Sequence, residues 1–294
     1  MKEFCLLAWI ALFVAAGAMP LWGQVALLDS DVYTKEFFRR HYPNCSPPDS
    51  YYLGANEYQR YFRGWEYVLK NELLIPYTLI HDADVTAGGL AKYKLLILSN
   101  TASLTDDQTK AIDRWVNGGG RLLATFGSGY KDFVVDLRED DLLKVQKGGT
   151  GGLHQLWHDP LSKLFSSALL DPGVDVRITD YSGPTSCLLG QLVNDVIPYG
   201  ANANILIQRP EQQKSVLAFL VIDNPDWKRP APAIISTRKS KGLVVYFSFA
   251  PEYLVSKEFD LPAALPCPDG QNWAGRSEKA RSLMRCTIQY LLAN

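Results

Sequence analysis

The segment from Tyr93 to Tyr130 constrains the fold of this chain more than any other. It begins with the continuous apolar run Leu95–Leu98, which is typical of a parallel strand buried on both faces. Thr105 followed by Gln108 is a capping box, and it predicts that a helix starts there. A second apolar strand, Arg121–Thr125, follows that helix after a short glycine link. Strand, helix and strand joined by short links predict a right-handed parallel sheet.

The rest of the chain extends this pattern into an α/β fold. The short polar link Arg238–Gly242 separates two apolar runs and predicts a C-terminal antiparallel hairpin. Helices are expected over Glu57–Asn71 and Leu161–Leu170, and a closing helix over Ala280–Leu291. Further strands are predicted at Val25–Leu28, Leu74–Ile80, Ile205–Gln208, Val216–Ile222, Ala233–Thr237 and Leu243–Phe249. We therefore expect a parallel sheet with helices on both faces, followed by the hairpin and the closing helix.

The amino terminus has the features of a secretory signal peptide. A lysine precedes the apolar run Phe4–Ala18, which is short for a membrane span, and Ala16-Gly17-Ala18 satisfies the small-residue rule for cleavage. We assign residues 1–23 to the signal and residues 24–294 to a single domain with an insertion at about 133–200. The mature protein is expected to be exported, to the periplasm or the extracellular space, and not to span a membrane.

Charge and composition argue against one class of partner. The 30 lysine and arginine residues nearly balance the 31 aspartate and glutamate residues, so the net charge is −1. The chain therefore lacks the positive field that concentrates proteins on nucleic acid. Nucleic acid is not an expected partner.

The cysteines are compatible with disulfide bonds in an exported protein. Of the five cysteines, Cys5 would be lost with the signal. The other four allow three pairings, and we favour Cys267–Cys286, which would tie a proline-rich loop to the last helix. Buried free thiols are the alternative. The remaining two candidates are Cys45 and Cys187, and a nucleophilic role for Cys187 is disfavoured because an exported thiol is normally oxidised or buried.

Four segments together resemble one known family. They are Asn71–Val85, Tyr93–Gln108, Trp115–Asp132 and Lys241–Tyr253. Their order and spacing are similar to those of the middle, trimerisation domain of family 42 β-galactosidases, which is a class I glutamine amidotransferase-like domain. The resemblance implies a flavodoxin-like or amidotransferase-like sheet. It also implies a role in building an oligomer and bordering an active site, because the family's catalytic carboxylates lie on a separate (β/α)8 barrel for which these residues leave no room.

The turn after Arg121–Thr125 carries the catalytic cysteine in class I amidotransferase-like folds. In this sequence Phe126 occupies that position, so we predict no catalytic residue there. Ser128 in Gly127-Ser128-Gly129 resembles the serine of a nucleophile elbow, but it lies one place beyond the expected apex. A serine nucleophile also needs a histidine base. The histidines are His41, His81, His154 and His158, and none lies late in the fold.

Metal binding is also disfavoured by the sequence. His154 and His158 would share one face of a helix, with Asp159 next to them. The neighbouring Gly152 and Pro160 oppose a helix, and we can identify no third ligand. We therefore predict no metal and no cofactor.

A ligand crevice is predicted where the parallel strands end. In open α/β sheets, ligands bind beyond the carboxyl ends of the strands. The plentiful tyrosines and tryptophans would suit stacking on sugar rings. The candidate residues at these strand ends are Asp29, Asn100, Thr101, Ser128, Tyr130 and Asp223.

Three functional hypotheses follow. The first is a secreted, non-catalytic module that binds carbohydrate or a glycosidase partner in extracytoplasmic carbohydrate metabolism. The second is a hydrolase that acts on a glycoside or an ester at the carboxyl-end crevice, through a carboxylate pair that the sequence does not identify. The third is a structural subunit that forms a homo-oligomer.

Overall fold

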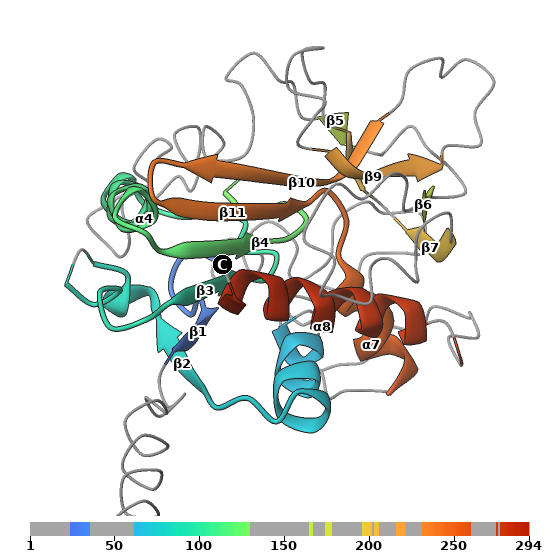
Figure 1. Cartoon of the computed structure of the whole chain (residues 1–294), viewed down its shortest axis with the longest axis horizontal. Helices are drawn as coiled ribbons and strands as arrows, with labels where there is room; N and C mark the ends of the chain where they lie inside the picture. Colours follow the sequence, from blue (N-terminus) through green and yellow to red (C-terminus); the bar gives the residue numbers. More distant parts are fainter. Residues whose placement is uncertain are drawn as a thin grey trace, which may run out of the picture.

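The computed structural model describes residues 24–35, 62–86, 88–129, 165–166, 174–177, 196–201, 203–205, 216–221, 231–259, 275 and 277–293. Within these residues the central feature is a nine-stranded sheet in the order β2-β1-β3-β4-β11-β10-β9-β6-β7 (Figure 1). The first five strands in this order run parallel to one another. They are β2 (Tyr77–His81), β1 (Val25–Asp29), β3 (Leu95–Leu98), β4 (Arg121–Ala124) and β11 (Gly242–Phe247).

The other half of the sheet is antiparallel. The hairpin of β10 (Ala231–Lys239) with β11 reverses the chain direction and pairs Arg238 with Leu243. Beyond β10 lie β9 (Val216–Val221), β6 (Val174–Arg177) and β7 (Val196–Ala201). A separate two-stranded sheet joins β5 (Phe165–Ser166) to β8 (Asn204–Ile205).

Alternate residues of the central strands enter two different cores. In β1, Val25 and Leu27 pack with the helices on one face, while Ala26 and Leu28 pack with α4 on the other. All four residues of β3 are buried, and so are all six of β11. This two-sided burial explains the continuous apolar runs in the sequence.

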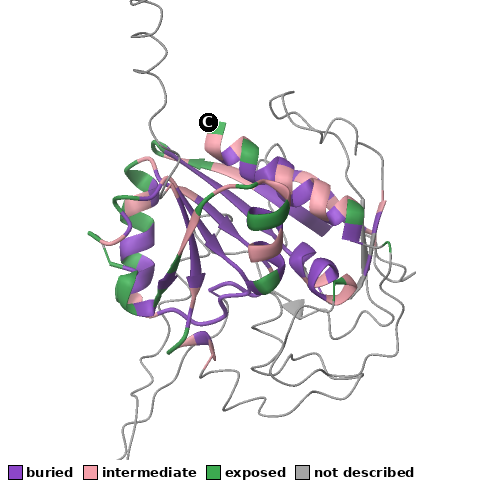
Figure 2. Ribbon diagram, turned by 90° about the horizontal axis from the view of Figure 1, so that it is seen from below, coloured by how far each residue is buried: buried purple, intermediate pink, exposed green. Residues whose placement is uncertain are grey.

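Helices cover both faces of the sheet, and Figure 2 shows the buried strands between them. The amphipathic helix α4 (Asp106–Asn117) places Ile112 and Val116 against one face. The other face is covered by the helical segment 62–72, whose last turn is the π-helix η1 (Val68–Glu72), and by α7 (Pro251–Glu258) and α8 (Ser277–Ala293). A short 3-10 helix, η2 (Asp82–Asp84), follows β2 directly.

An ion-pair cluster fastens the helical segment to the closing helix. The Glu72 carboxylate accepts hydrogen bonds from Arg281 at 2.6 Å and from Arg285 at 2.7 Å. The Glu72 side chain is 9% exposed, so solvent screens these pairs less than it screens surface pairs. This cluster links residues that are more than 200 positions apart in the sequence.

The sequence predictions for the fold are largely confirmed. The parallel sheet, the helices on both faces, the hairpin and the closing helix are all present. Thr105 and Gln108 make the predicted capping box. The helix predicted at Leu161–Leu170 is wrong at Phe165–Ser166, which form strand β5 because they pair with Asn204–Ile205. Parts of the predicted insertion, β6 and β7, lengthen the main sheet.

Several predictions concern residues that lie outside the described part of the chain. The signal peptide at 1–23 lies outside it, as do His41, Cys45, His154, His158, Cys187 and Cys267. Cys286 is buried and disulfide-bonded, but its partner is not among the described residues, so the pairing with Cys267 stays a prediction. Among the described residues, no helix combines the length and the apolar character that crossing a membrane requires.

The close approach of β11 to the end of α4 generates a test of the packing. A Cβ added at Gly242 would lie 2.0 Å from the backbone oxygen of Val116 and 2.6 Å from that of Gly120. Gly242→Ala should therefore lower the free energy of unfolding by about 1–3 kcal/mol, since backbone atoms must shift. Gly88→Ala, where nothing lies within 4 Å, should change it by less than about 0.5 kcal/mol. Equal effects of the two variants in urea denaturation would contradict the packing described here.

Candidate functional site

The carboxyl ends of β1, β3 and β4 bring polar residues to one edge of the sheet. The parallel register aligns Leu98 with Ala124, so the residues that follow these two strands are neighbours. Asp29 and Ser30 follow at the end of β1. Three clusters of buried polar side chains occupy this edge.

The first cluster holds the turn after β4. The Ser128 hydroxyl donates to the Leu98 carbonyl oxygen at 3.0 Å and accepts from the Thr101 amide at 3.1 Å. The Gly129 amide donates to the Thr101 carbonyl oxygen at 2.8 Å, and Gly127 and Gly129 have positive φ angles. The Ser128 side chain is fully buried. Its hydroxyl therefore fastens the turn to β3 and does not face solvent.

Phe126 lies in the middle of this turn and is half-buried. Its amide donates a hydrogen bond to the carbonyl oxygen of Phe249, which lies 3.4 Å away and two residues beyond β11. That Phe126 replaces a nucleophile at this turn stays a prediction from the sequence. His81 lies three strands away at the end of β2, which corresponds to about 14 Å at the usual strand spacing.

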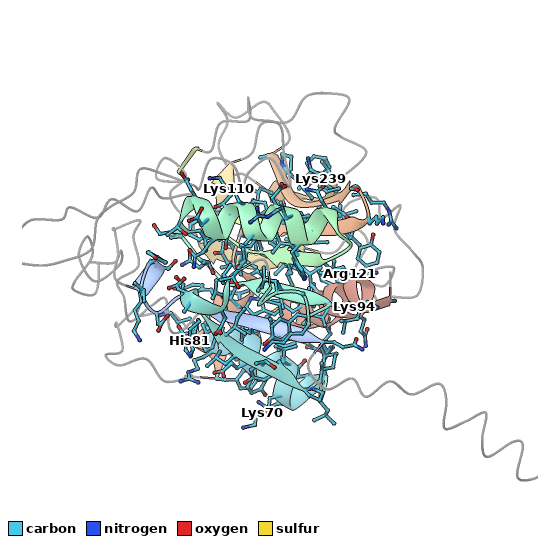
Figure 3. All side chains as sticks on the ribbon, turned by 90° about the vertical axis from the view of Figure 1, so that its left-hand side faces the viewer. Lys70, His81, Lys94, Lys110, Arg121 and Lys239 are labelled. Atoms are coloured by element: carbon cyan, nitrogen blue, oxygen red, sulfur yellow. The ribbon has the colours of Figure 1, made fainter. Side chains whose placement is uncertain are left out.

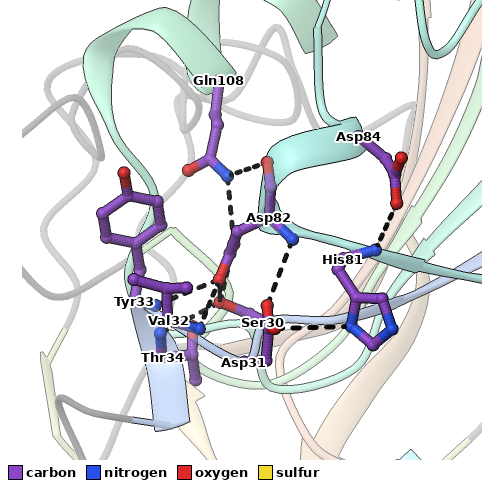
Figure 4. A network of polar contacts seen from close by, with 9 residues as sticks. All are labelled: Ser30, Asp31, Val32, Tyr33, Thr34, His81, Asp82, Asp84 and Gln108. Carbon is purple, nitrogen blue, oxygen red and sulfur yellow. Dashed lines mark hydrogen bonds and ion pairs between the residues drawn. The ribbon is translucent and has the colours of Figure 1, made fainter.

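The second cluster centres on Asp82 and connects three elements (Figure 4). Its carboxylate accepts from the Ser30 hydroxyl at 3.0 Å and from the amides of Val32 and Tyr33 at 2.8 Å and 3.0 Å. Gln108 of α4 donates its side-chain amide to both the carboxylate and the carbonyl oxygen of Asp82 at 3.0 Å. The loop after β1, the end of β2 and the first turn of α4 are therefore held by one carboxylate.

The electrostatic state of Asp82 is set by competing effects. Burial raises the pKa of the Asp82 carboxyl, and the hydrogen bonds from Tyr33, Gln108, Val32 and Ser30 oppose that rise. Next to this cluster, His81 and Asp31 form a longer and more exposed contact, with His81 Nδ1 3.7 Å from the Asp31 carboxylate. Burial also raises the pKa of Asp29, and Lys35 and His81 oppose the rise.

The third cluster surrounds Glu252 in the first turn of α7. Glu252 is fully buried, and its Oε1 accepts from the hydroxyls of Ser99, at 2.9 Å, and Thr125. A Cβ on Gly64 would lie 2.4 Å from the Glu252 carbonyl oxygen, so the helix at 62–67 passes directly over this residue. Desolvation raises the pKa of Glu252 to about 7, against the lowering effect of the hydrogen bonds from Thr125 and Ser99.

Some buried polar atoms at this edge have no hydrogen-bond partner. They include Oε2 of Glu252, Nε1 of Trp65 and Oγ1 of Thr101. The Trp65 side chain, next to Gly64 in the sequence, lowers the pKa of the Glu252 carboxyl group less than Thr125 and Ser99 do. An unpaired carboxylate oxygen in an apolar environment favours the protonated form, and this agrees with the raised pKa.

The structure places the predicted crevice residues as follows. Asn100, Thr101 and Ser128 lie together at the ends of β3 and β4, and all three are buried. Asn100 has a φ of 45°, and its Oδ1 would lie 2.8 Å from a Cβ on Gly127. Asp29 is half-buried at the end of β1, while Tyr130 and Asp223 lie outside the described residues. A ligand-binding role for these six residues stays a prediction.

The sequence reading missed the clustering of Glu252 with Ser99, Thr125 and Trp65. A glutamate that follows a proline at the start of a helix is normally interpreted as an exposed residue of the first turn, where its negative charge interacts favourably with the helix dipole. The signal in the sequence was Gly64, because a glycine in a helix allows another part of the chain, here Glu252, to pack closely against it. Within the described residues, no group of three or more histidine, cysteine or acidic side chains is placed to hold a metal ion.

Comparisons with known proteins agree with this architecture. No family model and no curated protein matches the chain by sequence. Among solved structures, a β-galactosidase from Bacillus circulans sp. alkalophilus matches 84% of this chain with a TM-score of 0.53 and 19% identity. A putative ThuA-like protein from Bacteroides uniformis matches 94% with a TM-score of 0.53 and 13% identity. A β-galactosidase from the haloarchaeon Halorubrum lacusprofundi matches 94% with a TM-score of 0.50 and 14% identity.

These matches define the class of fold. The chain spans 33% and 31% of the two β-galactosidase chains, but 93% of the ThuA-like chain. It has the class I glutamine amidotransferase-like fold, and the resemblance to a region of family 42 β-galactosidases is confirmed at the level of the fold. At identities below 20%, these matches show the fold alone.

The raised pKa of Glu252 predicts a pH dependence of stability. Between about pH 4.5 and pH 7 the folded protein holds a proton that the unfolded chain releases, so this group lowers stability as pH rises through that window. The loss is on the order of 3 kcal/mol. Glu252→Gln removes the titration and should become more stable relative to the unmodified protein as pH increases. Denaturation curves at pH 4.5, 6 and 8 measure this, and a constant difference between the two proteins would contradict it.

The Asp82 cluster predicts a loss of stability on charge removal. Asp82→Asn replaces one acceptor oxygen with an amide donor, so at least one of the donors from Ser30, Val32, Tyr33 and Gln108 loses its acceptor. Each unsatisfied donor costs about 1–3 kcal/mol. The matched control is Asp107→Asn, because the Asp107 side chain is 97% exposed, and it should cost less than about 1 kcal/mol. Urea denaturation of both variants decides whether Asp82 connects the three elements.

Proposed function

We propose that this chain is an exported, non-catalytic module with an amidotransferase-like fold, serving binding or assembly in extracytoplasmic carbohydrate metabolism. The observation that carries the proposal is the turn after β4. The Ser128 hydroxyl both donates and accepts a hydrogen bond within the fold, and the sequence resemblance places Phe126 where the nucleophile would be. The carbohydrate context is supported by the fold shared with regions of two β-galactosidases.

Assembly is supported by the apolar side chains near one edge of the sheet. Leu74 is 78% exposed and has a φ of 53°, and Leu79 in the outermost strand β2 is 39% exposed. A large apolar side chain held in the left-handed region and exposed to solvent gains nothing from the isolated fold. Contact with a second chain at β2 would bury both leucines. A homo-oligomer and a glycosidase partner are the two forms of assembly that we propose.

A hydrolase is the second candidate, and one observation favours it. Glu252 has a pKa of about 7, which is suitable for a general acid. Its side chain is fully buried beneath the helix at 62–67, so a substrate would have to displace that helix. This burial is why we rank the hydrolase below the module.

The two candidates predict different results with the purified protein. The module should not turn over chromogenic galactosides or esters, and Ser128→Ala and Glu252→Gln should leave any background rate unchanged. A ligand at about 100 times its dissociation constant should stabilise the protein by about 2.7 kcal/mol, so a thermal-shift screen with neutral mono- and oligosaccharides detects binding. Light scattering of the same sample measures self-association. Turnover that is abolished in either variant would establish the hydrolase instead.

A further inference from the structure

A depression of about 610 Å³ lies at the edge of the sheet opposite to the three polar clusters. It is formed where β3 begins and where α4 ends. Its lining includes three cationic residues, two aromatic residues and a glycine, namely Lys92, Lys94, Arg114, Tyr93, Trp115 and Gly120. None of the described residues that line it is acidic.

The charged side chains among the described residues that line this depression are all positive. Lys92, Lys94 and Arg114 line it, and the sheet register places Arg121 of β4 beside Lys94, since the Arg121 amide donates to the Lys94 carbonyl oxygen at 3.0 Å. Figure 3 shows Lys94 and Arg121 next to one another. Burial and the charge of Arg121 lower the pKa of Lys94, and burial and the charge of Arg238 lower the pKa of Arg121. The fold thus holds several cations close enough to repel one another.

Within the described residues, Lys94 and Arg121 contact carbonyl oxygens, and the Lys92 ammonium lies over the Tyr93 ring, 5.1 Å from its centroid. The Lys94 ammonium donates to the carbonyl oxygen of Leu292 near the end of α8, and Arg121 donates to Gly119 at 3.1 Å. The ends of α4 and α8 contribute a partial negative charge of about half a unit each, which offsets only part of the total. The Nε atom of Arg121 is buried and has no acceptor. A positive excess therefore remains.

The aromatic wall of the depression is fixed in place. The Trp115 indole N–H donates to the Tyr93 carbonyl oxygen at 3.3 Å. A Cβ on Gly120 would lie 2.3 Å from Trp115 Cδ2, so the indole ring lies directly against this glycine. The amides of Gly118, Gly119 and Gly120 already donate to carbonyl oxygens of α4. The lysine and arginine side chains are therefore the groups that can bind an anion, beside a rigid ring.

We propose that this depression is a binding site for a small anionic ring compound, such as a sugar bearing a phosphate or a carboxylate. The acid group would contact Lys92, Lys94 and Arg114, and the ring would pack on Trp115. The proposed site lies at the amino ends of the strands, whereas the proposed function rests on the turn at their carboxyl ends. The two proposals are therefore independent. A failure of either proposal leaves the other intact.

The test is calorimetric titration of the full chain with glucose 6-phosphate, glucuronate and neutral glucose at low ionic strength. We expect the two acids to bind and glucose not to bind. Lys92→Gln combined with Arg114→Gln removes two of the three proposed cationic contacts and should weaken binding at least tenfold. Both side chains are exposed, so the double variant should still fold. The control variant combines Lys70→Gln with Lys110→Gln, which removes the same charge from exposed sites outside the depression.

Three results would overturn the proposal. The first is that neither acid binds. The second is that the control variant loses as much affinity as the site variant, which would indicate a general charge effect. The third is that inorganic phosphate binds as tightly as glucose 6-phosphate, since the ring would then contribute nothing. Circular dichroism of each variant confirms that it is folded before titration.

Discussion

Burial of the central strands on both faces is the constraint on which the rest of this structure depends. Because β1, β3, β4 and β11 deliver alternate residues to two separate cores, neither face of the sheet can display chemistry. Polar and charged groups are confined to the two edges where the strands end. Within the described residues, the carboxyl edge and the amino edge of these strands have different characters.

At the carboxyl edge, the polar groups are mainly used to connect elements. Asp82 joins the loop after β1 to α4, Ser128 joins the turn after β4 to β3, and Glu252 joins α7 to β3 and β4. Each carboxyl group is desolvated, and hydrogen bonds offset part of the cost. Among the described residues, these three side chains are therefore engaged in contacts within the fold.

The sequence predicted those parts of the structure that depend on local pattern. Leu95–Leu98, the capping box at Thr105 and the hairpin around Lys239 are short-range signals, and each is present. Phe165–Ser166 was misassigned because its pairing partner is about forty residues away, and periodicity does not detect such contacts. The same limit applies to the site. Asn100 and Ser128 were found by counting from strand ends, but the burial of Glu252 depends on Gly64, which lies far away in the sequence.

The amino edge shows why charge is more informative than shape in this molecule. A depression between a helix end and a strand start is common in α/β folds, and alone it would suggest nothing. What distinguishes this one is that Lys94 and Arg121 are held together against mutual repulsion, although a single neutral substitution would relieve it. An anion bound beside these side chains would offset their repulsion and stabilise the folded protein. The concentration of positive charge is therefore the feature of this edge that supports the proposed ligand site.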